Sequence, residues 1–272
     1  MARHPRRNEG KDKVAGWSPA GRHGGRPATK HGAASAGADW IWGWHATLAA
    51  LGNPLRGPPR RLVATAERAR ELAARLPVLP AVEIADAAAI AQLLPHGAAH
   101  QGVALKAGPL EPLSLDELAS PAEGVLVMLD QVTDPQNVGA VFRSAAAFGA
   151  RGVIVQDRHA PAFTGALVKA AAGALDLTPH ARVVNLARAL DQLADLGWRA
   201  VGLAGDADEP LDQVLDARPT VLVLGSEGEG LRRLVGEHCD ALARIPMPGG
   251  FESLNVSAAA AIALYEAARR AR

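Results

Sequence analysis

From residue 124 onward, short apolar runs alternate with stretches that have the apolar spacing of helices. The runs are residues 125–129, 152–155, 200–203, 221–224 and 242–245, the last of which is interrupted by Arg244. Continuous apolar runs of this length are typical of strands that are buried on both faces, as in a parallel sheet covered by helices. The pattern therefore predicts an α/β fold in which ligands bind beyond the carboxyl ends of the strands.

The helical stretches between these runs are residues 137–148, 166–172, 186–196 and 231–238, followed by a final alanine-rich helix. In this last helix the apolar residues Val256, Ala260, Ala263, Leu264 and Ala267 fall at helical spacing. They are predicted to form its buried face.

A smaller alternation precedes this region. Strands are predicted at 61–65, 82–84 and 102–105, and helices at 45–51, 66–75 and 90–94. We therefore expect a small α/β domain at residues 39–108 and a larger one at 124–272. Residues 109–123 contain three prolines and are predicted to be a linker.

The net charge of +1 conceals an uneven distribution. Residues 1–38 carry eight Lys or Arg against Glu9 and Asp12, a net charge of +6, and the remaining residues carry 21 basic and 26 acidic groups, a net charge of −5. The first segment lacks periodicity and is predicted to be a disordered basic tail. It is either a contact to a polyanion such as RNA or a solubilising arm.

Several classes of protein are disfavoured by the composition. The single cysteine, Cys239, excludes a disulfide framework and fits a reducing cytoplasm. The nine histidines are scattered without zinc-ligand spacing, so no metal site is expected. Neither a secretory leader nor a membrane span is indicated, and we expect a cytoplasmic protein.

The first polar motif follows the strand at 125–129. Asp134 and Pro135 are typical of a helix start, and Asn137 follows them. Arg143 lies in an otherwise apolar helix, where a lone guanidinium suits a phosphate oxygen. A solvated helix face would also explain Arg143, and local turn hydrogen bonds would explain Asn137.

The second motif, Gly-Ser-Glu-Gly-Glu-Gly at residues 225–230, separates a predicted strand from a helix. Its backbone N–H groups are therefore free to meet a ligand. It is neither a P-loop nor a nicotinamide fingerprint, because no Lys-Ser/Thr follows and the glycine spacing differs. Glu227 would repel a phosphate and suits a cationic or hydroxyl-bearing ligand, although a plain glycine turn is also tenable.

The third motif, residues 245–257, contains Ser253, Asn255 and Ser257 directly before the last helix. These side chains are either ordinary helix caps or part of a reaction centre. Because both later motifs are at strand ends, we expect a small-molecule pocket joined to a reactive site.

Together the motifs Asn-x5-Arg, Gly-Ser-Glu-Gly-x-Gly and Ile-Pro-Met-x6-Leu-Asn-Val-Ser resemble the SpoU/TrmH branch of the SPOUT methyltransferases, over residues 123–269. This resemblance implies methyl transfer from S-adenosylmethionine to a ribose 2′-hydroxyl of RNA, without a metal. It also implies a deep trefoil knot, an exception to the rule against knots, and a homodimer. Residues 169–174 depart from the pattern, with alanines where relatives often carry serine or cysteine.

Residues 40–105 resemble the small RNA-binding domain of the large-subunit rRNA guanosine methyltransferases in this branch. The matching segments are Gly-Trp-His-Ala at 43–46 and His-Gln-Gly-Val at 100–103. The same reaction on tRNA is the nearest alternative, although the tRNA enzymes generally lack this domain. A non-catalytic RNA-binding assembly factor would have lost motif residues that are all present here.

The resemblance also implies roles for particular residues. The donor would be held by Leu224, Gly225, Ile245, Met247 and Leu254, mostly through backbone groups. The reaction centre would consist of Asn137, Arg143, Glu227, Ser253 and Asn255. We expect Arg143 to bind the neighbouring phosphate and stabilise the forming alkoxide. A free guanidinium keeps its proton up to about pH 12, so the identity of the general base stays open.

Overall fold

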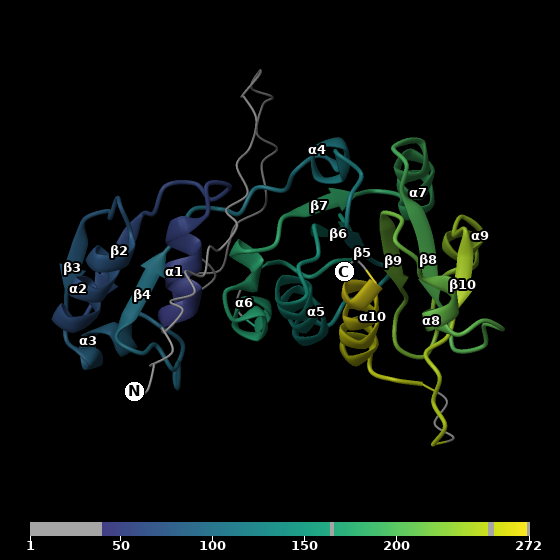
Figure 1. The fold of residues 1–272 in the computed structure, drawn as a ribbon. Helices are drawn as coiled ribbons and strands as arrows, with labels where there is room; N and C mark the ends of the chain where they lie inside the picture. Colours follow the sequence, from purple (N-terminus) through teal and green to yellow (C-terminus); the bar gives the residue numbers. More distant parts are fainter. Residues whose placement is uncertain (1–39, 164–165, 250–252, 271–272) are drawn as a thin grey trace, which may run out of the picture. The chain divides into compact units, whose positions relative to one another are not determined.

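The computed structural model describes residues 40–163, 166–249 and 253–270 (Figure 1). The basic segment 1–38, which we expected to be disordered, lies outside the described residues. The described chain forms two sheets, one of six strands and one of four.

The larger sheet is parallel throughout, with strand order β10-β8-β9-β5-β6-β7. Its strands are β5 (Val125–Leu129), β6 (Gly152–Gln156), β7 (His180–Val183), β8 (Arg199–Leu203), β9 (Thr220–Leu224) and β10 (Ala241–Ala243). The predicted parallel α/β fold is confirmed. β7 was not predicted, because its sequence His-Ala-Arg-Val lacks a continuous apolar run.

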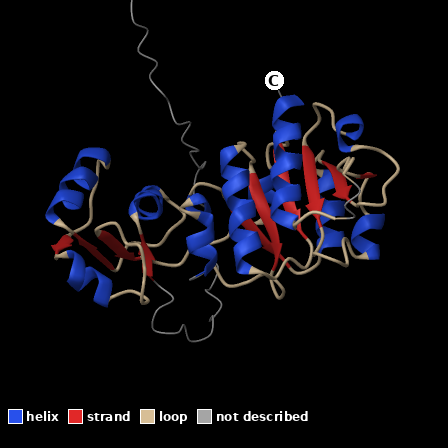
Figure 2. Ribbon diagram, turned by 90° about the horizontal axis from the view of Figure 1, so that it is seen from below, coloured by secondary structure: helices blue, strands red, loops and turns tan. Residues whose placement is uncertain are grey.

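Helices cover both faces of this sheet, as Figure 2 shows. One core contains side chains of α5 (Pro135–Ala147), α6 (Ala166–Ala171), α8 (Leu211–Val214) and α10 (Val256–Arg270). The other contains α4 (Leu115–Ala119), α7 (Leu186–Asp195) and α9 (Arg233–Glu237). Alternate strand residues supply the two cores, as with Val127 and Met128 of β5, because side chains along a strand alternate between faces.

Local sequence explains where the two helices nearest the site lie. The Asp134 side chain accepts a hydrogen bond from the Gln136 backbone N–H, and Pro135 is the first residue of α5. In α10 all five residues predicted to face inward are buried, which confirms the predicted apolar face.

The smaller sheet has the order β1-β4-β2-β3, in which only β2 and β3 are parallel. Its elements are β1 (Trp40–Trp42), α1 (Trp44–Gly52), β2 (Arg61–Ala64), α2 (Ala66–Arg75), β3 (Val82–Ile84), α3 (Ala87–Gln92) and β4 (Val103–Lys106). The three-residue strand β1 was not predicted. Helix α3 begins three residues earlier than expected, because Asp86 accepts a hydrogen bond from the Ala89 N–H.

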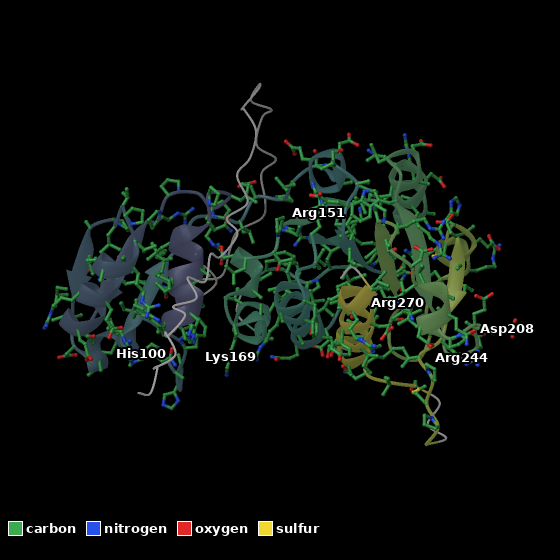
Figure 3. The ribbon with its side chains drawn as sticks, viewed as in Figure 1. His100, Arg151, Lys169, Asp208, Arg244 and Arg270 are labelled. Carbon is green, nitrogen blue, oxygen red and sulfur yellow. The ribbon has the colours of Figure 1, made fainter. Side chains whose placement is uncertain are left out.

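Residues 109–123, predicted to be a linker, contain the helix α4. Ser114 and Glu117 form a capping box, a signal that was available in the sequence. Leu118 is buried in the core beneath, and Arg151, labelled in Figure 3, donates a hydrogen bond to its carbonyl oxygen at 2.6 Å. This part of the segment is therefore packed against the larger sheet.

Candidate active site

A cavity of about 870 Å³ lies beyond the carboxyl ends of β8, β9 and β10. Its volume is in the usual range for small-molecule sites. The structure places around it all the residues that were expected to hold a donor: Leu224, Gly225, Ile245, Met247 and Leu254. Leu203, the last residue of β8, and residues 204–206, which follow it, also line the cavity. They were not singled out from the sequence, although they too are at a strand end.

The glycine loop, residues 225–230, forms one wall of the cavity. A Cβ atom on Gly225 would lie 2.0 Å from the carbonyl carbon of Gly230 and 2.4 Å from the nitrogen of Leu231. Gly228 and Gly230 have φ values of 88° and 68°, which favour glycine. The loop thus folds back on itself so closely that a side chain at Gly225 would force it open.

A carboxylate oxygen of Glu227 joins three segments of the chain. Glu227 Oε1 accepts hydrogen bonds from Asn137 Nδ2 at 2.8 Å and from Asn255 Nδ2 at 2.6 Å. The backbone N–H of Val256 donates to the same oxygen at 3.4 Å. The glycine loop, the first turn of α5 and the start of α10 therefore meet at this oxygen.

The oxygen and the nitrogen of the Asn255 side-chain amide have different roles. Its Oδ1 accepts hydrogen bonds from the backbone N–H groups of Ser257 and Ala258, at 2.9 and 3.3 Å, and so caps α10. This leaves Nδ2 to donate to Asn137 Oδ1 at 2.9 Å and to Glu227. Of the three side chains that were considered as helix caps, Asn255 caps the helix, while Ser253 is exposed and lines the cavity.

Arg143, also predicted for the reaction centre, makes no hydrogen bond to this cluster. It lies on α5 six residues after Asn137, is exposed, and makes no hydrogen bond or ion pair with any residue that the structure describes. Nor is it among the residues that line the cavity. Its guanidinium is therefore available to a ligand that approaches from solvent.

Metal ligands and membrane spans were also sought in the described parts of the chain. Residues 40–163, 166–249 and 253–270 hold no group of three or more His, Cys, Asp or Glu side chains that could bind a metal ion. Burial raises the pKa of the Cys239 thiol to about 12, so the thiolate that binds metals or acts as a nucleophile is not formed near neutral pH. Within the same residues no helix is both long and apolar enough to cross a membrane.

The sequence profile of the SpoU rRNA Methylase family matches residues 124–265, slightly more than half of the chain. The chain belongs to this family. The match starts one residue before β5 and includes the glycine loop, Asn137, Arg143 and most of α10. The family assignment that the three motifs suggested is therefore confirmed.

Known proteins of similar sequence and structure agree with SpoU membership. An uncharacterized tRNA/rRNA methyltransferase of Mycolicibacterium vanbaalenii is 47% identical over 178 residues, which cover 64% of this chain and 57% of that protein. This chain thus spans less than two thirds of that curated relative.

Two solved structures resemble this SpoU family protein over most of their length. The SpoU methyltransferase AviRb from Streptomyces viridochromogenes, in complex with the cofactor AdoMet, matches with a TM-score of 0.71 and 29% identity, over 86% of this chain and 90% of that one. An RNA 2′-O ribose methyltransferase matches with a TM-score of 0.65 and 26% identity, over 85% and 88% of the two chains.

Proposed function

We propose that this protein transfers a methyl group from S-adenosylmethionine to a ribose 2′-hydroxyl of RNA. One observation carries the proposal. The glycine loop lines the cavity, and its residue Glu227 also forms a polar cluster with Asn137 and Asn255, so the cavity and the cluster are adjacent. The likeness to a donor-bound SpoU structure and to an RNA 2′-O ribose methyltransferase supports it.

The residues around the cavity fit this donor. The Gly225 backbone lines the cavity, while Leu203, Ile245 and Met247 supply apolar surface for an adenine ring. The carboxylates Asp206 and Glu229 also line the cavity and would attract the positively charged methionine portion. When bound, S-adenosylmethionine would supply a methyl group on a positively charged sulfur, which would leave as a neutral thioether.

The protein's part in the reaction is to align the ribose oxygen and to manage its proton. Asn137 and Asn255 are held rigidly by Glu227, so their positions are set before RNA binds. Ser253, exposed at the cavity, can donate a hydrogen bond to the nucleotide. Arg143, with its free guanidinium, would bind the adjacent phosphate and stabilise negative charge on the 2′-oxygen.

A guanosine of large-subunit rRNA is the target that we favour. The support is that strands β1 to β4 form a separate small sheet in the segment whose sequence resembles the RNA-binding domain of the rRNA enzymes. The relatives' names include both tRNA and rRNA, so tRNA is the alternative substrate. The two substrates are distinguished by incubating the protein with labelled donor and either unmodified rRNA or unmodified tRNA. We expect label in rRNA alone. Label confined to tRNA would contradict the choice of rRNA.

We also propose that the protein is a homodimer and that its C-terminal segment is knotted. Ile262 and Tyr265, three residues apart on α10, are 42% and 52% exposed, and such an apolar pair on one helix face suits a partner copy. Sedimentation should give a dimer that Tyr265→Glu converts to monomers. A wild-type monomer at the same concentration would contradict the dimer.

A further inference from the structure

Asp130 follows β5 directly and is fully buried among apolar strand ends. Its carboxylate is occupied entirely by one residue. Oδ2 accepts a hydrogen bond from the Arg232 backbone N–H at 2.9 Å, and Oδ1 lies 2.7 Å from both the Nε and a terminal nitrogen of the same guanidinium. A buried carboxylate is unfavourable unless it is paired in this way.

Asp130 also reaches the other end of the glycine loop. Its backbone N–H donates to the carbonyl oxygen of Leu224 at 2.8 Å, which continues the pairing of β5 with β9. Leu224 directly precedes the loop, and Arg232 lies two residues after Gly230, the last glycine of the loop. One residue therefore fastens the chain on both sides of the loop.

The loop's tip is fastened separately, through Glu227 to Asn137 and Asn255. The loop thus has three fixed points, of which the strand pairing at Leu224 depends only on backbone atoms. The point at Arg232 depends on the Asp130 side chain. Arg232 lines the cavity and Asp130 does not, so the contacts that connect Asp130 to a ligand there pass through the loop.

We propose that Asp130 is a positioning residue for the donor site: its carboxylate holds Arg232, and with it the end of the glycine loop, in the conformation whose backbone groups face the cavity. The identity of the ligand rests on the proposed function, but the effect on the loop does not. Loss of the carboxylate should loosen residues 225–232 and weaken donor binding together.

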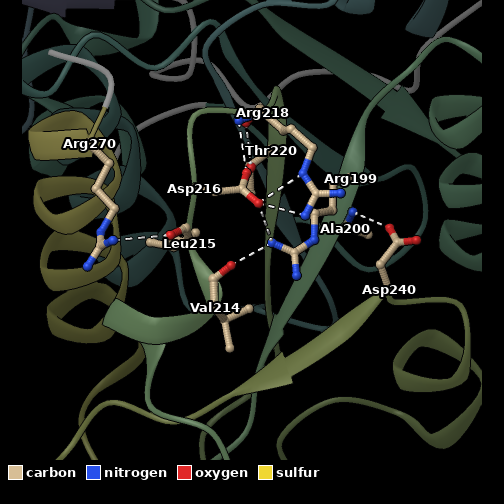
Figure 4. Close-up of polar contacts among 9 residues, drawn as sticks. All are labelled: Arg199, Ala200, Val214, Leu215, Asp216, Arg218, Thr220, Asp240 and Arg270. Atoms are coloured by element: carbon tan, nitrogen blue, oxygen red, sulfur yellow. Dashed lines mark hydrogen bonds and ion pairs between the residues drawn. The ribbon is translucent and has the colours of Figure 1, made fainter.

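Four variants test this role. Asp130→Asn places an amide N–H against donors that now meet a carboxylate, and Arg232→Ala keeps only the backbone hydrogen bond. Arg232→Lys retains a cation that can pair with Oδ1. The matched control is Asp216→Asn, which removes a carboxylate that binds Arg218 at 2.6 Å and Arg199 at 3.5 Å, at the amino ends of β8 and β9 (Figure 4).

Two measurements are made on each full-length variant: amide hydrogen exchange of residues 225–232 without ligand, and calorimetric affinity for S-adenosylmethionine. Asp130→Asn should speed exchange in the loop and raise the Kd about tenfold. Arg232→Ala should act in the same direction, because it leaves the buried Asp130 carboxylate with one hydrogen bond and no cation. Arg232→Lys should restore most of the affinity, and Asp216→Asn should change neither measurement.

The outcomes separate the inference from the proposed function. Faster loop exchange in Asp130→Asn, with no donor binding even by the wild type, would support the positioning role and contradict the donor assignment. Unchanged exchange and affinity in both Asp130→Asn and Arg232→Ala, with a wild type that binds the donor, would overturn the positioning role. If Asp130→Asn does not fold, the comparison of Arg232→Ala with Arg232→Lys decides the question, because the Arg232 side chain is 41% exposed.

Discussion

Asn255 donates a hydrogen bond from Nδ2 to the Asn137 side-chain oxygen at 2.9 Å, although 118 positions separate them in the chain. Asn137 belongs to the first turn of α5 and Asn255 immediately precedes α10. The two helices next to the polar motifs are therefore linked at their N-termini, at the edge of the sheet where the strands have their carboxyl ends and where the cavity lies.

Two replacements of Asn255 should separate its roles. Asn255→Ser keeps a cap for α10 but loses the bonds to Asn137 and Glu227, whereas Asn255→Ala loses both. We expect each to lower kcat/KM about 100-fold through misplacement of the reacting groups. Only Asn255→Ala should also lower the free energy of unfolding, by about 1 kcal/mol. Steady-state kinetics and urea unfolding measure the two effects, and full activity in Asn255→Ser would contradict the account.

Arg143→Ala should separate catalysis from donor binding. Because Arg143 does not line the cavity, the Kd for S-adenosylmethionine should stay within about twofold of wild type, while methylation falls at least about 100-fold. The control is Arg188→Ala, an exposed arginine on α7, which covers the opposite face of the sheet. Wild-type turnover in Arg143→Ala would remove this residue from the reaction centre.

Gly225→Ala should weaken donor binding through the loop's shape. The new Cβ would lie within 2.4 Å of the backbone of Gly230 and Leu231, so the loop must open. We expect a Kd for the donor at least about tenfold higher by calorimetry. Gly52→Ala, at a position with open space in α1, is the control and should bind normally. Equal affinities in the two variants would show that the close contact of Gly225 with Gly230 and Leu231 is not needed for donor binding.

His180 should make stability depend on pH. Burial, followed by the charges of Arg182 and Arg56, lowers the pKa of its ring from 6.5 to about 3. The centre of the Phe163 ring lies 4.6 Å from the centre of the His180 ring. As the pH falls below 6.5 the unfolded chain binds a proton that the folded ring does not. This contribution to stability is therefore complete above pH 6.5 and is lost progressively toward pH 3.

His180→Leu should remove this loss. Between pH 7.5 and pH 5, the free energy of unfolding of the wild type should fall by about 2 kcal/mol more than that of the variant. Urea unfolding at the two pH values gives the difference directly. Parallel changes in the two proteins would mean that the ring is protonated in the folded state.

The parts of the fold that could be predicted from the sequence are those with a clear apolar period. Strands β5 and β9 are continuous apolar runs, and the five inward residues of α10 fall at helical spacing. Strand β7 escaped prediction because His180 is buried by aromatic neighbours that lie elsewhere in the chain, and Arg182 lies over the Phe163 ring. Helix α4 was not predicted because Pro112 and Pro121 flank it, and prolines are typical of a linker.

The site divides in a similar way. Glycines and polar residues at strand ends identified the cavity's walls and the cluster around Glu227, because parallel strands bring their carboxyl ends to one edge. Which side chain caps α10, and which residue anchors the glycine loop, could not be predicted. The anchor depends on a contact across the fold, between Asp130 and Arg232, which are 102 positions apart. The cap is a local contact of Asn255 with Ser257 and Ala258, but the motif offered three polar side chains as candidates for it.

The most direct test of ribose methylation is to map the modified nucleotide. Unmodified large-subunit rRNA is incubated with the protein and S-adenosylmethionine and then hydrolysed in alkali, which cannot cleave next to a 2′-O-methylated ribose. We predict one gap in the ladder of fragments, absent when Glu227→Ala replaces the wild type. Methyl incorporation with an unbroken ladder would place the methyl group elsewhere and contradict the account.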